Sequence, residues 1–207
     1  MPVWAWWQFV TRFNVAPHQY VPAVRLHEGQ SEAVMMRWGL IPRSIEESPR
    51  PGPSPHCIDS DALERCASHR QPWLEGRRCI LPVAGYYTWQ LTAAKYRQPW
   101  FAHPRDRAVF GIAAVWDRFE SKDEDVVESC SIIRVPANDL MLEIANTDPR
   151  MPAILRRKDY EIWLRGTPEA ALAALQPYKC EWMQAHPVSP RINCPEADDP
   201  DLVRPAA

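Results

Sequence analysis

The chain has 207 residues, of which 46% are hydrophobic, so it can bury one substantial core and needs no second domain. Its formal net charge is −2, which excludes a global basic excess; any contact with nucleic acid must come from a local basic patch. The apolar stretches fall short of the roughly 20 residues that a membrane-spanning helix needs. We therefore expect one domain over residues 1–207 and no contact with a membrane.

The N-terminal residues lack the basic region and small-residue cleavage pattern of a secretory signal, which predicts a cytoplasmic location. Six cysteines occur without a Cys-x-x-Cys pair, so we expect free, mostly buried thiols. No His, Cys or Asp grouping has metal-ligand spacing, and we expect neither a metal nor another cofactor.

The predicted elements describe a sheet with a few short helices. Alternating or β-branched apolar runs predict strands at residues 21–26, 33–40, 78–82, 86–89, 100–103, 108–116 and 126–135. Helices are predicted at 61–69, 138–144, 158–164 and 167–176, the last beginning at the capping sequence Thr167-Pro168-Glu169. The class is α+β, dominated by a mostly antiparallel sheet. Three segments stand apart: a Trp-rich N-terminus (1–11), a Pro-rich loop (44–56) and a C-terminal tail (193–207).

Six motifs occur in a fixed order along this chain. They begin with Arg-Phe-Asn-Val-Ala-Pro at 12–17 and Arg-Trp-Gly-Leu-Ile-Pro at 37–42, and they continue at 77–82, 85–89, 150–155 and 186–189. In this order they resemble the signature blocks of the SRAP family, the SOS response-associated peptidases that process abasic sites. The resemblance implies a barrel-like SRAP domain, a role in the DNA damage response and contact with single-stranded DNA.

Members of that family attach themselves covalently to the aldehyde of an abasic site. The resemblance implies that an N-terminal cysteine supplies an amine and a thiol, while an Asn, a Glu and a His hold the site and move protons. At the matching positions this chain has Pro2, Asp59, Thr88 and Ala145, or Ile58 in place of Asp59 after a slip of one residue. Thr88 and Ala145 cannot replace the carboxylate and imidazole. We therefore expect an SRAP scaffold that has lost the cross-linking chemistry.

The signature blocks also supply candidate DNA contacts. Guanidinium groups suit phosphate, and Trp38 with Pro42 resembles an apolar wedge against unstacked bases. For each of these side chains, ion pairing or core packing is an equally good interpretation. The predicted interface comprises Arg12, Asn14, Arg37, Trp38, Pro42, Arg43, Arg77, Arg78, Arg150, Met151 and Pro152.

Other interpretations stay open at this stage. Removal of the initiator Met would leave Pro2 as a secondary amine that can form an iminium with an aldehyde, which would keep an abasic-site lyase activity. The N-terminus also looks shortened relative to the family. A module that binds only other proteins is a further alternative. Trp4, Trp6 and Trp7 favour packing, and His186 favours a structural role.

Overall fold

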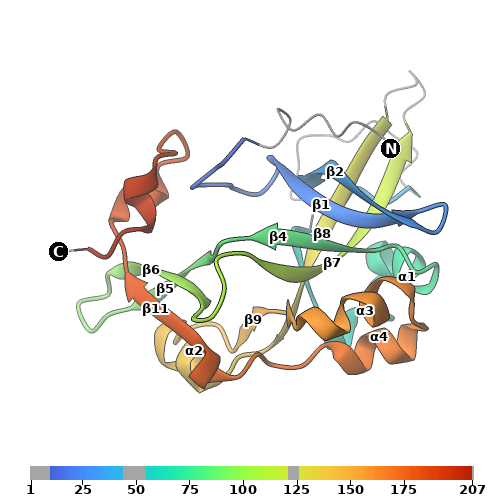
Figure 1. Cartoon of the computed structure of the whole chain (residues 1–207). Helices are drawn as coiled ribbons and strands as arrows, with labels where there is room; N and C mark the ends of the chain where they lie inside the picture. The colour runs from blue at the N-terminus through green and yellow to red at the C-terminus, as the bar shows by residue number, and fades with distance from the viewer. Residues whose placement is uncertain (1–9, 44–54, 121–125, 207) are drawn as a thin grey trace.

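The structure is a computed structural model that describes residues 10–43, 55–120 and 126–206 (Figure 1). The strands in these residues are β1 (Tyr20–His27), β2 (Gln30–Trp38), β3 (Cys57–Asp59), β4 (Arg78–Val83), β5 (Tyr86–Leu91), β6 (Arg97–Pro104), β7 (Phe110–Glu120), β8 (Val126–Pro136), β9 (Arg150–Pro152), β10 (Ile154–Leu155) and β11 (Met183–Pro187). The α-helices are α1 (Ala67–Leu74), α2 (Asp139–Ile144), α3 (Tyr160–Arg165) and α4 (Pro168–Ala174).

Five strands close a barrel. β1 pairs with β2 and β4, β4 pairs with β7, β7 pairs with β8, and β8 returns to the end of β2. Every pair in this ring is antiparallel except β2 with β8, which is parallel. The expected α+β class with a mostly antiparallel, barrel-like sheet is therefore confirmed.

Strand β8 has 11 residues, as many as β7, and changes neighbours along its length. Its first half pairs with β7 on one side and with the end of β2 on the other. Its second half pairs with β3, in parallel, and with β9, antiparallel. Three signature regions, at the ends of β2, β3 and β9, are thus aligned on one strand.

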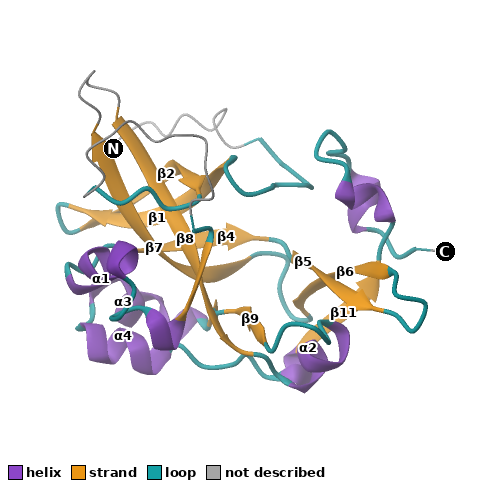
Figure 2. Cartoon of the chain, turned by 180° about the vertical axis from the view of Figure 1, so that it is seen from behind, coloured by secondary structure: helices purple, strands orange, loops and turns teal. Residues whose placement is uncertain are grey.

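A second sheet and the helices lie around the barrel (Figures 1 and 2). β11, β6 and β5 form a three-stranded antiparallel sheet. In both views this sheet and α2 lie at one end of the barrel, while α1, α3 and α4 gather at the other. Ala102 of β6 and Met183 of β11 belong to the same buried apolar cluster as the barrel interior.

The interior is filled by aromatic rings at the helical end and by small side chains on β7. The rings of Trp73 and Trp163 lie 6.0 Å apart, and the Arg78 guanidinium lies 5.4 and 5.8 Å from their centres. Ala113 and Ala114 of β7 are fully buried. Small residues on this strand leave room for the large rings that pack against it.

Two predicted helix starts are confirmed by their caps. The Asn138 side chain accepts from the Met141 N–H at 3.0 Å, and the Thr167 hydroxyl accepts from the Ala170 N–H at 3.3 Å.

The predicted helix at 61–69 was wrong in its position. Residues Ser60–Ala62 form one 3-10 turn, and the α-helix begins only at Ala67 and continues through Pro72. The predicted start at residue 61 is therefore nearly two turns too early.

Other differences are smaller. The strand predicted at 108–116 is displaced to Phe110–Glu120, and the short strands β3, β9, β10 and β11 were not predicted. All six cysteines are free, as expected, but only Cys79 and Cys130 are buried, and Cys194 is exposed. Most of the Pro-rich loop lies outside the described residues. Within those residues, no helix combines the length and apolar character needed to cross a membrane.

His69 of α1 makes the stability of the fold depend on pH. Its side chain is fully buried, and this desolvation lowers its pKa from 6.5 to about 4. A histidine whose pKa is lowered in the folded state stabilises the fold above the unfolded pKa, and that contribution is lost as pH falls from 6.5 towards 4. We expect the free energy of unfolding to fall by about 3 kcal/mol between pH 7 and pH 4 from this group.

Urea denaturation at the two pH values measures this loss. His69→Gln should remove about 3 kcal/mol of the pH dependence, whereas His27→Gln, at an exposed position of β1, should leave it unchanged. An unaltered pH dependence in His69→Gln would contradict the assignment.

Candidate nucleic-acid interface

Asp59 and Ala145, two positions where the sequence predicts that a catalytic residue has been replaced, are connected by a series of polar contacts. Asp59, at the end of β3, faces Arg134 of β8, whose guanidinium donates to the Asp59 carboxylate at 2.8 and 2.9 Å. The same guanidinium donates to Asp148 at 2.9 Å. The Asp148 N–H in turn donates to the Ala145 carbonyl at 2.9 Å. Asp59 and Ala145 are thus joined through Arg134 and Asp148.

Thr88 lies on the face of β5 that looks towards α2. Side chains alternate along a strand, so Thr88 shares a face with Tyr86 and Gln90. Tyr86 Oη donates to the sulfur of Met141 at 2.9 Å, and Gln90 Nε2 donates to the Glu143 carbonyl at 3.3 Å. Both acceptors belong to α2, the helix that ends beside the Asp148 ion pairs. Thr88 therefore faces this helix, and Ala145 directly follows its last residue.

A second arginine extends these ion pairs. Arg150 of β9 lies 3.7 Å from Asp59 and donates to Asp61 at 3.1 and 3.2 Å. We call the five residues Asp59, Asp61, Asp148, Arg134 and Arg150 the Asp–Arg cluster. Three carboxylates against two guanidinium groups give it a net charge of −1. Because Asp61 and Asp148 are half exposed, these pairs contribute only about 0–1 kcal/mol each and can exchange with other partners.

Trp38 lies at the end of β2 beside a group of basic side chains. Its Nε1–H donates to the His56 carbonyl at 2.8 Å, and the two rings meet edge-on with centres 5.8 Å apart. Arg37 donates to the Gly39 carbonyl at 2.7 Å, and its Nη2 lies 2.8 Å from Nδ1 of His18. The partly exposed indole therefore contacts the imidazole of His56, while the preceding residue, Arg37, contacts His18.

His56 connects this group to the Asp–Arg cluster. Burial lowers the pKa of His56, and the positive charges of His18 and Arg134 lower it further. His56 is therefore within electrostatic reach of both groups. The imidazole is mainly neutral at neutral pH and gains a positive charge in acid.

Backbone contacts fix the segment that follows Trp38. The Gly39 N–H donates to the Cys130 carbonyl at 2.8 Å, and the Ile41 N–H donates to the Ser129 hydroxyl at 2.8 Å. Both acceptors belong to β8. Pro42 is buried, so its contacts in this structure are those of core packing.

The remaining predicted arginines lie apart and have internal partners. Buried Arg77 pairs with the buried carboxylate of Asp117, which also pairs with the half-exposed Arg43 at 3.3 Å. Arg78 is 3% exposed and donates to the Trp163 and Gly166 carbonyls. Arg78 therefore has a structural contact, and we leave it out of the interface proposed below.

The segment at 12–17 is tied to the C-terminal tail. The Asn14 amide is buried and donates to the carbonyl of Ile192, just before the tail, and to the tail carbonyls of Cys194 and Ala197, at 3.0–3.2 Å. Arg12 pairs with Asp198. These contacts give Asn14 and Arg12 a role in holding the tail.

Other predicted residues have simple positions. Met151 is a buried residue of β9, and the next residue, Pro152, is opposite Arg134 in the β8–β9 ladder. His186 lies 2.9 Å from the Val203 carbonyl, a contact with the tail backbone. Pro2, Trp4, Trp6 and Trp7 lie outside the described residues. No group of three or more His, Cys, Asp or Glu side chains placed to hold a metal ion occurs in the part of the chain that the structure describes.

The sequence interpretation did not include Arg134, Asp148, His18 or His56 in the site. His18 directly follows the motif at 12–17 and His56 precedes Asp59 by three residues, so adjacency to the motifs was an available signal. Arg134 and Asp148 carried no motif, because only the pairing of β3 with β8 brings them to Asp59.

Comparisons with known proteins agree with this geometry. The chain is 28% identical over 195 residues to the abasic site processing protein YoqW of Bacillus subtilis, covering 92% of this chain and 84% of that protein. It is 26% identical to the mouse abasic site processing protein HMCES, over 96% of this chain and 66% of the mouse protein. A crystal structure of a protein from Bacteroides thetaiotaomicron superposes with a TM-score of 0.83 at 28% identity, covering 92% of this chain and 82% of that one.

The sequence profile of the family described as SOS response associated peptidase (SRAP) matches residues 5–195. This span includes the barrel, the second sheet and the Asp–Arg cluster. The chain belongs to the SRAP family.

Proposed function

We propose that this chain binds single-stranded DNA, including strands that carry an abasic site, without forming a covalent bond. The observation that carries the proposal is the alignment of a partly exposed indole and several cationic side chains along β8. Trp38 offers a stacking surface, while Arg37, Arg134 and Arg150 offer donors for phosphate. The relatives from B. subtilis and mouse are named for the processing of abasic sites, which supports a damaged strand as the ligand.

The replaced residues support binding without cross-linking. Ala145 is buried and has no side chain that can move a proton, and Thr88 offers only a hydroxyl. The carboxylate of Asp59 is engaged by two guanidinium groups, so it differs in charge and availability from a neutral amide. The carboxylates of Asp59, Asp61 and Asp148 are held in ion pairs with arginine.

The charge of the cluster sets what kind of binding to expect. Phosphates must displace carboxylates from Arg134 and Arg150, which weakens the electrostatic gain at that end of the interface. The indole of Trp38 is not subject to this competition. We therefore expect modest affinity, with stacking as a large part of it.

Trp38→Ala should weaken binding to a short single strand about tenfold, since stacking on an aromatic side chain contributes roughly 1–3 kcal/mol per base.

Arg150→Gln should make the dependence of affinity on salt less steep, by about 0.7 in the log–log slope, because one phosphate contact is lost. Fluorescence anisotropy with a labelled oligonucleotide at several salt concentrations measures both effects.

Arg118→Gln is the matched control, because Arg118 is an exposed residue of β7 that pairs with Glu120 outside this interface. It should bind as the unmodified protein does. Equal affinity of the Trp38 and Arg150 variants and the unmodified protein would reject the proposed interface. Absence of any salt-sensitive binding to single strands would favour the interpretation as a module that binds only proteins.

The covalent alternative is tested with a strand that carries one abasic site. After incubation with the protein, with and without borohydride, a denaturing gel should show no shifted band, because the residues that complete the cross-link are replaced. A peptide with an N-terminal cysteine, incubated with the same strand, is the positive control. A band trapped by borohydride and lost in Pro2→Ala would instead establish an enzyme that uses Pro2.

A further inference from the structure

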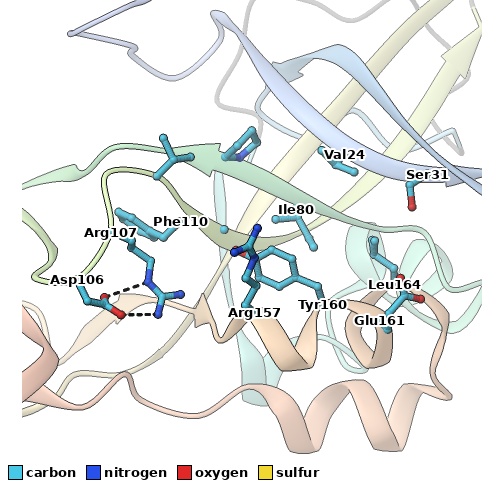
Figure 3. Close-up of a pocket in the computed structure, with 13 residues that line it drawn as sticks. Val24, Ser31, Ile80, Asp106, Arg107, Phe110, Arg157, Tyr160, Glu161 and Leu164 are labelled. Carbon is cyan, nitrogen blue, oxygen red and sulfur yellow. Dashed lines mark hydrogen bonds and ion pairs between the residues drawn. The ribbon is translucent and has the colours of Figure 1, made fainter. Parts of the chain in front are cut away.

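A cavity of about 630 Å³ opens on the barrel wall, between β1, β4 and β7 on one side and α3 on the other (Figure 3). Its size is within the range of roughly 300–1,000 Å³ that is typical of small-molecule sites. It shares no residue with the interface proposed above. What binds there is therefore a separate question from the binding of DNA.

The base of the cavity is apolar. Val24, Ile80, Phe110 and Leu164 line it, and these side chains come from four different elements. Val109 stands at the rim and is 60% exposed. The cavity can therefore take up an apolar body.

Gly111 keeps the wall of the cavity flat. A Cβ atom at this position would lie 2.5 Å from Ile80 Cγ2 and 2.8 Å from the Tyr160 hydroxyl. The Tyr160 ring lies directly against the backbone of β7, and no larger residue fits there without moving it. A wall formed by backbone and the edge of a ring suits a planar or narrow ligand.

The four charged side chains that line the cavity balance in sign, and Arg165, which pairs with Glu161 from outside the lining, adds one positive charge. Arg107 is neutralised by a two-point contact with Asp106 at 2.8 and 3.0 Å (Figure 3). Glu161 accepts from Arg165 at 2.8 Å, and Arg165 lies outside the cavity lining. Arg157 also lines the rim, exposed to solvent, and within the described residues no carboxylate forms an ion pair with it. The rim therefore favours a negative group near Arg157.

We infer that this cavity binds a small organic anion, whose apolar body lies against Ile80, Phe110 and Leu164 and whose carboxylate, sulfonate or phosphate contacts Arg157. Buried apolar area provides the larger part of the affinity, and the guanidinium orients the anion. Arg107 adds a second donor only if the ligand displaces Asp106.

The test uses a fluorescent anion of this chemistry, 1-anilinonaphthalene-8-sulfonate, and its neutral counterpart N-phenyl-1-naphthylamine. The sulfonate should bind at one saturable site. Arg157→Glu should weaken it at least tenfold, while Arg118→Glu, on β7 but outside the cavity, should change it less than twofold. The neutral compound should bind more weakly than the sulfonate and should not respond to Arg157→Glu.

A second variant guards against an effect of Arg157→Glu on folding. Val109→Asp places a negative charge at an exposed rim position and should also weaken the sulfonate. Sulfonate binding that is unaffected by both variants would overturn the inference, as would absence of a saturable site. Displacement of the sulfonate by single-stranded DNA would also overturn it, because the dye would then occupy the DNA interface. The first two outcomes do not depend on whether the chain binds DNA.

Discussion

The pairing of β8 with its neighbours is the constraint on which the candidate site depends. The first half of this strand closes the barrel against β7 and the end of β2, and the second half receives β3 and β9. Trp38, Asp59 and Arg150 are distant in sequence, and each lies on a segment whose hydrogen bonds run to β8. Because the register of these pairs is fixed by buried residues on the other face, such as Ile133, the relative positions of the three side chains are fixed as well.

The scaffold itself does not depend on the side chains at positions 59, 88 and 145. Barrel closure uses backbone hydrogen bonds and buried apolar side chains, and none of these requires a Glu, a His or an Asn at those positions. The site contains an ion-pair cluster with a slight negative excess next to Trp38 and Arg37. A DNA strand that follows β8 would meet, at Arg134 and Arg150, arginines that already have carboxylate partners. Such a surface favours contact through bases over contact through phosphate.

The sequence predicted the class of the fold and most of the longer strands, because alternation of apolar residues is a local property that survives folding. It also identified the caps at Asn138 and Thr167, where one side chain bonds a backbone group three residues away. It placed the first helix wrongly, since Pro72 is accepted inside α1 where its ring is buried. Arg78 was predicted as a DNA contact because it lies in a signature block, and only the folded chain brings it the carbonyls of Trp163 and Gly166. For the same reason Arg134 and Asp148 could not be assigned to the site: their contacts with Asp59 and Ala145 depend on pairing between distant strands.

Hydrogen–deuterium exchange with and without a single-stranded oligonucleotide tests the central claim most directly, because it locates the bound strand along the chain. If β8 organises the interface, the bound oligonucleotide should slow amide exchange in residues 37–41, 56–61 and 146–150 together. The amides of β5, β6 and β11 should keep their exchange rates. Slower exchange confined to the three-stranded sheet or to the C-terminal tail would contradict the account.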